Sequence, residues 1–361
     1  MKGTRKCICM SLISILLLTL SPNNASAISV SAAGAILMEQ QSGRVLYEKN
    51  PHDIRRIASI TKIMTAIIAI ESGKLNDSVK VSKKAVYTEG SSVYLQQGEL
   101  IRLEDLVYGL MLRSGNDAAI AIAEHVGGSV EGFVFLMNQK AEEIGMGNTA
   151  FANPHGLDDH EDHYSTPYDM ALLTRYAMEN ETYQKISGTK VYTFERKQGT
   201  QQWKNKNRLL MMYPYSTGGK TGFTKRASRT LVTTASKDGV NLIAVTLNDP
   251  NDWDDHAAMY EYGFATYEIK RLLNKGPILE VKDIKNKEVY IKEDFYYPLS
   301  DTDLKELKIE YKLLSRTKLK EKKSGKVGLA IVYFQNDPIK KLPIYIKDMN
   351  DKGDGDHWWK K

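Results

Sequence analysis

Apolar residues recur with two different spacings in the longer, N-terminal part of the chain, and their order predicts a fold. Stretches typical of strands occur near both ends of this part, over 33–48 around a Ser42-Gly43 turn and over 229–249 around Lys237-Asp238-Gly239. Helical spacing occupies the stretches 59–70, 104–125, 130–145, 167–180 and 254–269. Strands at both ends of a helical middle predict an α/β (α+β) fold, in which helices flank an antiparallel sheet.

Two of the predicted helical stretches differ from the others. The stretch 59–70 is apolar on nearly every side, and a helix of this kind is buried at the centre of a domain. The stretch 104–125 is interrupted by Arg113-Ser114-Gly115-Asn116, which predicts two helices with a break between them. We therefore expect a buried central helix and a polar break in the helical region.

The pattern changes near Asn274-Lys275-Gly276-Pro277. From there to about Lys347 the chain alternates short strand-like runs with polar turns, and helical spacing is lost. This predicts a domain over 28–273, a separate small all-β domain over 274–348, and a flexible tail over 349–361.

The first 27 residues have the composition of an export signal. Lys2, Arg5 and Lys6 precede a short apolar run, and Ala25-Ser26-Ala27 forms a small-residue cleavage site. Both cysteines of the chain lie in this segment, so the mature protein has no thiol or disulfide. Cleavage removes three positive charges and lowers the net charge from +6 to +3. We expect an exported, extracytoplasmic protein that does not bind nucleic acid.

Ser59 and Lys62 are the first candidates for chemistry, because they stand three residues apart at the start of the apolar helix. Residues at this spacing share one helix face, and burial lowers the pKa of a lysine enough to make it a base for serine. Two further Ser-x-x-Lys matches occur, at Ser187/Lys190 and Ser315/Lys318. Neither precedes an apolar helix, so context favours Ser59.

Two further short motifs offer polar groups. Ser114 and Asn116 lie in the predicted break, where a hydroxyl can pass a proton and an amide can hold a carbonyl. Lys220-Thr221-Gly222 precedes the predicted hairpin. The lysine and threonine can bind a carboxylate, and the glycine lets an extended substrate approach the strand closely. A similar triplet, Lys323-Ser324-Gly325, lies in the β-rich region and is interpreted as a turn.

The order Ser-x-x-Lys, Ser-x-Asn, Lys-Thr-Gly is found in β-lactamases and penicillin-binding proteins. With "AILMEQQSGRVLYEKN", "GLMLRSGNDAAIAIAEHVGGS", "NPHGLDD" and "GGKTGFT", the chain resembles the serine D-alanyl-D-alanine carboxypeptidases of peptidase family S11 over essentially its whole mature length. These are low-molecular-mass penicillin-binding proteins, and the similarity is greatest to the sporulation-type enzymes of spore-forming bacteria. The resemblance implies a β-lactamase/transpeptidase-like catalytic domain with a helical lobe, followed by a small β domain.

The resemblance also implies an activity and residue roles. The enzyme would remove the terminal D-Ala from peptidoglycan stem peptides through an acyl-enzyme, in spore cortex or cell wall maturation, and would be acylated by β-lactam antibiotics without a cofactor or metal. Ser59 would be the nucleophile, Lys62 the general base and Ser114 a proton-transfer partner. The remaining implied roles are substrate binding and an oxyanion hole, carried by Asn116, Lys220, Thr221, Gly222, the backbone N–H of Ser59 and that of Phe223.

The sequence departs from the family pattern in three places. Relatives often carry a carboxylate-binding arginine in the stretch that corresponds to 246–261, and this stretch contains none. Arg226 and Arg229 are the remaining candidates. Position 223 is Phe where some relatives have His. The tail lacks an evident amphipathic helix, so the two tryptophans and two lysines at 358–361 predict at most a weak peripheral membrane contact.

Three alternative functions stay open at this point. A serine β-lactamase would share the nucleophile and the fold, although Ser-Gly-Asn and the added β domain argue against it. A metal-binding protein could use the histidines and aspartates of the loop 153–166, although no His-Glu-x-x-His helix is present. A non-catalytic cell-wall binder could use the basic stretch 315–326.

Overall fold

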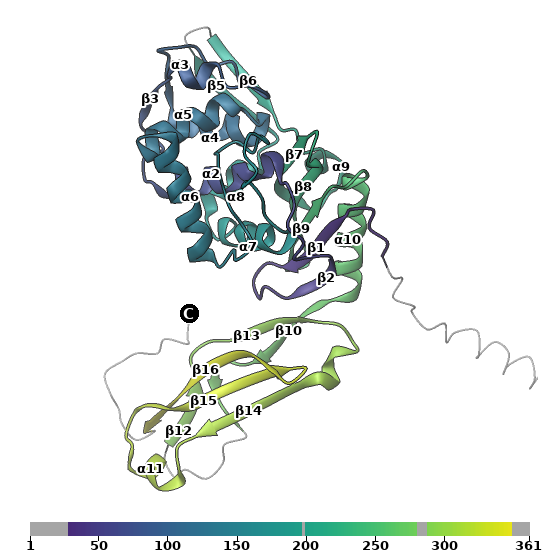
Figure 1. Ribbon diagram of the computed structural model, residues 1–361. Coiled ribbons are helices and arrows are strands. Elements are labelled where there is room, and N and C mark those ends of the chain that lie inside the picture. The colour runs from purple at the N-terminus through teal and green to yellow at the C-terminus, as the bar shows by residue number, and fades with distance from the viewer. Residues whose placement is uncertain (1–27, 197–198, 280–286, 349–361) are drawn as a thin grey trace, which may run out of the picture.

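The computed structural model describes residues 28–196, 199–279 and 287–348. Figure 1 shows two bodies, an N-terminal domain of helices around a sheet and a smaller C-terminal β domain below it. The predicted signal segment (1–27) and the predicted tail (349–361) lie outside the described residues. The predicted combination of a helix-flanked antiparallel sheet and a small all-β domain is what the structure has.

The N-terminal domain is built on one five-stranded sheet in which all neighbours are antiparallel. In spatial order its strands are β2 (Val45–Lys49), β1 (Gly34–Glu39), β9 (Val240–Leu247), β8 (Ser228–Lys237) and β7 (Ser216–Thr224). The first and last strands of the domain therefore meet at its centre, where β1 pairs with β9, as strands at both ends of a helical middle predict.

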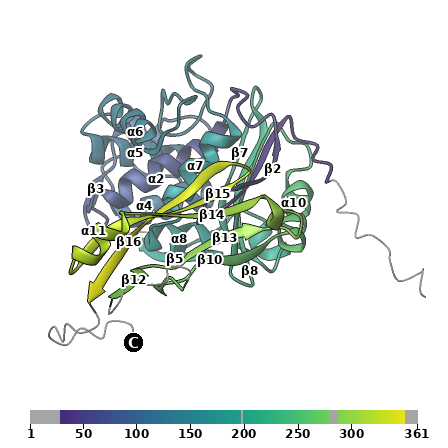
Figure 2. The ribbon, with the colours of Figure 1, turned by 90° about the horizontal axis from the view of Figure 1, so that it is seen from below.

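Helices cover both faces of this sheet (Figures 1 and 2). On one face lies α10 (Asp252–Thr266), and on the other lie α2 (Lys62–Glu71), α7 (Pro167–Ala177) and α8 (Glu181–Gly188). A helical lobe extends from the second face and contains α3 (Lys83–Val86), α4 (Leu103–Tyr108), α5 (Asn116–Gly127) and α6 (Val130–Ile144). Smaller elements complete the domain, namely β3 (Ser78–Lys80), β4 (Leu100–Arg102), β5 (Val191–Arg196), β6 (Gly199–Lys204) and α9 (Leu209–Met212).

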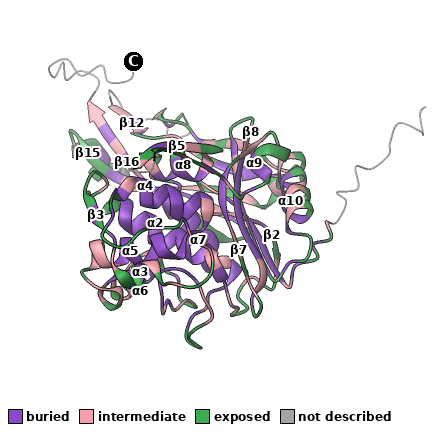
Figure 3. Ribbon diagram, turned by 90° about the horizontal axis from the view of Figure 1, so that it is seen from above, coloured by how far each residue is buried: buried purple, intermediate pink, exposed green. Residues whose placement is uncertain are grey.

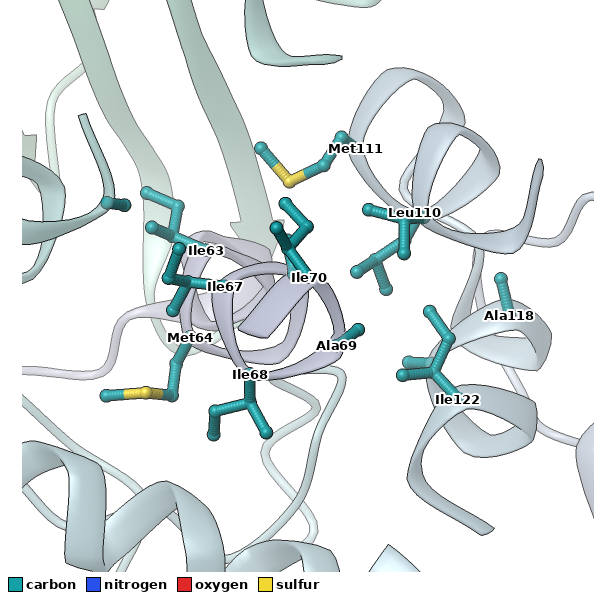
Figure 4. Close-up of a cluster of buried hydrophobic side chains, with 14 of the residues drawn as sticks. Ile63, Met64, Ile67, Ile68, Ala69, Ile70, Leu110, Met111, Ala118 and Ile122 are labelled. Carbon is teal, nitrogen blue, oxygen red and sulfur yellow. The ribbon is translucent and has the colours of Figure 1, made fainter. Parts of the chain in front are cut away.

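Helix α2 is the centre of the larger hydrophobic core, as its apolar composition predicts. Every residue from Lys62 to Ile70 is buried, and Figure 3 shows the helix surrounded by other buried elements. Figure 4 shows side chains of α2 beside those of the lobe, including Leu110 and Ile122. Burying each such aliphatic side chain contributes about 1.5–3 kcal/mol. The packing holds the first residues of α2 in a fixed position.

The predicted break within 104–125 is confirmed. Helix α4 continues into a π-helical segment, Gly109–Arg113, which ends at Ser114 with left-handed backbone angles (φ 64°) before α5 begins at Asn116. Two predicted helices end three residues early. The helix expected over 167–180 ends at Ala177. The helix expected over 254–269 ends at Thr266, and Glu268 already belongs to a strand that is hydrogen-bonded to the C-terminal domain.

The C-terminal β domain consists of a five-stranded sheet and a two-stranded sheet. The larger sheet has the order β11 (Gly276–Pro277), β12 (Lys287–Ile291), β16 (Asp337–Asp348), β15 (Gly325–Phe334) and β14 (Leu307–Leu313). The smaller one pairs β10 (Glu268–Leu273) with β13 (Phe295–Leu299). Two short helices, η3 (Asp303–Glu306) and α11 (Arg316–Glu321), complete the domain. Strand β10 precedes residue 274, the predicted start of this domain, but pairs with a strand inside it.

Arg44, in the turn between β1 and β2, joins the two domains. Its guanidinium donates to the Pro298 carbonyl (2.5 Å) and pairs with Asp303 (2.9 Å), and both ionic side chains are largely buried. The same guanidinium lies 5.3 Å from the ring centroid of Tyr297 and 4.4 Å from that of Phe334. The hydrogen bond, the ion pair and the aromatic rings together fix the position of this largely buried guanidinium, so the domain contact has a definite geometry.

Candidate active site

Ser59 lies in a single 3-10 turn, η1 (Ala58–Thr61), that leads into α2. The preceding residue, Ala58, is buried and has positive φ (49°), a conformation that is costly for alanine. Gly156 makes this conformation possible, because a Cβ there would lie 1.9 Å from the Ala58 carbonyl oxygen. The strained turn is thus held by close packing against the loop 153–166, and it presents Ser59 at the sheet edge.

Lys62 is completely buried one turn after Ser59. Its Nζ lies 2.9 Å from Ser59 Oγ, 2.7 Å from Asn116 Oδ1 and 2.5 Å from the His155 carbonyl oxygen. Burial, followed by the positive charges of Lys220 and Lys206, places the pKa of Lys62 well below its ordinary value. A neutral amine has two hydrogens and one lone pair. It can donate to the Asn116 and His155 oxygens and still accept a proton from Ser59.

Ser114 and Lys220 form a second buried pair. Lys220 Nζ lies 3.0 Å from Ser114 Oγ and 2.6 Å from the Thr221 carbonyl oxygen. Burial is the main cause that lowers the pKa of Lys220 to about 7, and the charge of Lys206 adds to it. Two buried lysines therefore face two serine hydroxyls, and neither ammonium has a carboxylate partner among the contacts of the described residues.

Strand β7 passes directly beside Ser59. A Cβ at Gly222 would lie 3.0 Å from the Ser59 backbone nitrogen and 2.3 Å from Thr230 Oγ1, so only glycine fits there. Thr230 Oγ1 also donates to the Ile57 carbonyl (2.9 Å), which ties the sheet to the turn that carries Ser59. The missing side chain at Gly222 therefore lets strand β7 lie against the turn that carries Ser59.

A cleft of about 300 Å³ opens over these groups. Its lining residues are Ser59, Ser91, Ser114, Lys206, Thr221, Gly222, Phe223, Arg229, Asp252 and Trp253. The structure thus brings all eight predicted site residues together, five in the lining and Lys62, Asn116 and Lys220 immediately behind it. The Phe223 side chain is 67% exposed at the rim.

Ser91 and Lys206 are cleft residues that the sequence analysis missed. Lys206 Nζ lies 3.3 Å from Ser91 Oγ, and its charge lowers the pKa of both buried lysines. The Ser91 carbonyl accepts a hydrogen bond from the Asn116 backbone N–H (2.7 Å), which fixes this loop against the start of α5. The sequence feature that could have indicated Ser91 is the Ser91-Ser92 pair in a loop rich in turn residues.

The two candidate arginines have different surroundings. Arg229 lines the cleft opposite Phe223 in the β7–β8 ladder, and Asp252 holds its guanidinium at 2.5 Å. Arg226 is absent from the lining and pairs with Glu161 through two hydrogen bonds of 2.7 and 2.9 Å. Of the two arginines, only Arg229 therefore offers a cation to the cleft.

None of the remaining motif candidates lines the cleft. Ser187 is buried in α8 and donates to the Gln184 carbonyl, while Ser315 precedes the short helix α11 in the C-terminal domain. His155 and His163 are buried with pKa values of about 3 and accept backbone N–H groups. Among the described residues, no group of three or more histidine or acidic side chains is placed to hold a metal ion.

These features define a serine acyl-transfer enzyme. A serine is hydrogen-bonded to a buried lysine, and a neighbouring strand edge can align an extended peptide. The comparisons with known proteins agree. Residues 21–251 match the family model Peptidase_S11, D-alanyl-D-alanine carboxypeptidase. D-alanyl-D-alanine carboxypeptidase DacF of Bacillus subtilis is 32% identical over 95% of this chain and 94% of its own length. The chain belongs to the S11 family of D-alanyl-D-alanine carboxypeptidases.

Solved structures extend the similarity to both domains. Penicillin-binding protein 5 of Haemophilus influenzae superposes with a TM-score of 0.73 at 26% identity, covering 90% of this chain and 98% of that one. The D-alanyl-D-alanine carboxypeptidase of Mycobacterium tuberculosis H37Rv has a TM-score of 0.63 at 31% identity, and covers 66% of this chain and 92% of its own. The predicted β-lactamase/transpeptidase-like fold with a C-terminal β domain is confirmed.

Proposed function

We propose that this serine D-alanyl-D-alanine carboxypeptidase acts through an acyl-enzyme on Ser59, with Lys62 as the general base. Ser59 Oγ attacks the carbonyl carbon of the penultimate D-Ala while its proton passes to Lys62 Nζ. The amide bond breaks, D-alanine leaves with a proton, and water then cleaves the Ser59 ester to regenerate the hydroxyl. The observation that carries this assignment is the 2.9 Å contact between Ser59 Oγ and a buried amine whose other two partners are neutral oxygens.

Ser114 is the proposed route for the proton to the leaving amine. Its hydroxyl already accepts from Lys220 at 3.0 Å, which leaves the Ser114 hydrogen free to point into the cleft. Asn116 would hold Lys62 through Oδ1. Its Nδ2 donates one hydrogen to the Glu89 carbonyl (2.6 Å) and would donate the other to the substrate's amide carbonyl. The backbone N–H groups of Ser59 and Phe223 would stabilise the oxyanion.

The terminal carboxylate of the substrate would lie at the cationic end of the cleft. Lys220 and Thr221 are the predicted partners, and Lys206 and Arg229 add two further cations that line the same cavity. Arg229 would bind the carboxylate in place of the arginine that relatives often carry in the stretch corresponding to 246–261. Asp252 orients it, since an ion pair of 2.5 Å fixes one of its terminal nitrogens.

Release of D-alanine from a pentapeptide ending in D-Ala-D-Ala tests this function. The chain from residue 28 should release one D-alanine for each peptide, and Ser59→Ala should release none, while Ser315→Ala should match the wild type. Benzylpenicillin should form a slowly hydrolysed adduct. Fast turnover of benzylpenicillin without release of D-alanine would instead identify a β-lactamase.

The family acts on peptidoglycan, outside the cytoplasm. For this protein we further propose how it is processed after export and how weakly it contacts the membrane. We expect cleavage after Ala27, a division of the mature chain into domains near residue 274, and at most a weak membrane contact through 349–361. Among the described residues no single helix has the length and apolarity to cross a membrane. Helices α5 and α6 are long and apolar enough only when taken together, and the chain bends by 84° between them. A role in spore cortex maturation stays a prediction, which muropeptide analysis of spores lacking the protein would test.

A further inference from the structure

The larger sheet of the C-terminal β domain packs one face on the domain's hydrophobic core, and among the described residues no side chain of the opposite face belongs to a core cluster. The packed face carries the domain's core, including Val332, Ile344 and Ile346, and lies toward β10, β13 and α11. Side chains alternate between faces along each strand, so the ladder register assigns the opposite set to the other face. We call this set the outer face, and it consists of Glu288, Tyr290, Lys292, Lys308, Glu310, Lys312, Lys326, Leu329, Ile331, Tyr333, Lys341, Pro343, Tyr345 and Lys347.

Lysines and tyrosines are interleaved on the outer face. Lys292 Nζ lies 4.1 Å from the ring centroid of Tyr345, and Tyr345 lies beside Tyr290 at 5.8 Å between centroids. On the other side of the sheet's centre, Lys308 Nζ lies 5.8 Å from the ring centroid of Tyr333. The cations lie over the faces of the rings. These faces are therefore not free to stack on a sugar.

The outer face has a strong excess of positive charge. Six lysines stand against two glutamates, and each glutamate pairs with one lysine, at 3.1 Å for Lys347 and 3.7 Å for Lys312. The other four, Lys292, Lys308, Lys326 and Lys341, have no acidic partner among the described residues, and all four are exposed. Five strands spaced about 4.8 Å apart make this face roughly 20 Å wide.

This charge belongs to the domain and not to the whole protein. Residues 268–348 contain 19 Lys and Arg against 13 Asp and Glu, whereas residues 28–267 contain 25 against 28. The domain therefore has a net charge of +6 and the rest of the mature chain before it has −3. An anionic surface would attract the C-terminal domain and repel the N-terminal one, which orients the protein.

We propose that the outer face docks on the anionic headgroups of the membrane that the exported protein has crossed. An array of lysines with interspersed tyrosine rings matches a headgroup layer, where lysine meets phosphate and tyrosine occupies the interface. Docking this face turns the N-terminal domain, at the far side of the Arg44 contact, away from the membrane.

Sedimentation with vesicles tests the docking. The chain from residue 28 should bind vesicles of phosphatidylglycerol and phosphatidylcholine, should not bind phosphatidylcholine alone, and should dissociate as salt is raised. Combining Lys308→Glu, Lys326→Glu and Lys341→Glu should weaken binding by at least about a hundredfold, because each lysine near an anionic surface contributes about fivefold. Release of D-alanine from a soluble pentapeptide should be unchanged, which shows that the variant is folded.

A matched control lies in the same domain. Lys318→Glu, Lys320→Glu and Lys323→Glu change the charge equally, but on the side of α11, whose Leu319 belongs to the packed core. This control should retain nearly all the binding. Equal loss in both variants would overturn the proposal in favour of non-specific attraction. The proposal would also be overturned if only the deletion of 349–361 abolished binding to vesicles. It would be overturned too if the outer-face triple variant lost binding to isolated cell walls but kept its binding to vesicles.

Discussion

Lysine has opposite roles in the two domains, and burial accounts for the difference. In the N-terminal domain Lys62 and Lys220 are fully buried, neither has a carboxylate partner among the described residues, and their pKa values are lowered. In the C-terminal domain most lysines of the outer face are exposed, and Lys292 and Lys308 lie over tyrosine rings. Desolvation turns an ammonium into a base or a titratable binding group, while exposure leaves it a permanent surface charge. The residue type alone therefore predicts neither role.

Replacing Lys62 is expected to have the largest effect. Lys62→Arg should reduce the rate of acylation by about 10³-fold or more, nearly as much as Lys62→Ala, because arginine keeps its proton in proteins. Acylation by a fluorescent penicillin measures both variants. Substantial activity in Lys62→Arg would mean that position 62 needs only a positive charge, and the distinction between the two kinds of lysine would fail.

Replacing Arg229 should have a smaller effect, confined to substrate binding. Arg229→Gln should raise KM for a D-Ala-D-Ala pentapeptide by roughly tenfold with little change in kcat, because one charge-assisted contact contributes about 1.5–3 kcal/mol at most. Arg226→Gln removes an equal charge from the exposed pair with Glu161 and should change KM less than about twofold. Equal effects of the two would indicate long-range attraction in place of contact.

Removing Lys206 should move the pH dependence of binding. Lys220 has a pKa of about 7, so the free enzyme loses this cation as pH rises through 7, and KM for the carboxylate substrate should increase there. Lys206→Gln removes a neighbouring positive charge, which raises the pKa of Lys220 and moves the increase in KM to higher pH. Lys204→Gln, at an exposed position of β6, serves as the control and should leave the profile in place.

The domain contact at Arg44 should affect stability and leave chemistry unchanged. Arg44→Met should destabilise the contact by about 2–4 kcal/mol, since it leaves Asp303 largely buried without a partner and removes the cation from the aromatic rings. Arg271→Met breaks a 3.9 Å pair with Asp294 at the surface and should cost less than about 1 kcal/mol. Calorimetry of both variants checks this, and a kcat changed by Arg44→Met would show that the domains are coupled in catalysis.

Much of the site could be predicted because its residues follow one another in short motifs. Ser59 and Lys62 are adjacent on one helical turn, and Ser114 with Asn116 span a break that glycine marks. Ser91 and Lys206 are much harder to predict, since neither belongs to a motif and their contact joins a loop to the segment after β6. The helix that ends at Thr266 was predicted too long because its last residues keep an alternating apolar pattern that also suits strand β10. The Arg44 contact likewise depends on tertiary structure, as a single arginine in a turn is ordinarily a surface residue.

The acyl-enzyme on Ser59 can be observed directly. Intact-mass measurement of the chain from residue 28 after brief exposure to benzylpenicillin, followed by proteolysis and fragment sequencing, locates the adduct. We expect one penicilloyl group per chain, on Ser59, and no adduct in Ser59→Ala. An adduct on Ser114, or full labelling of Ser59→Ala, would contradict it.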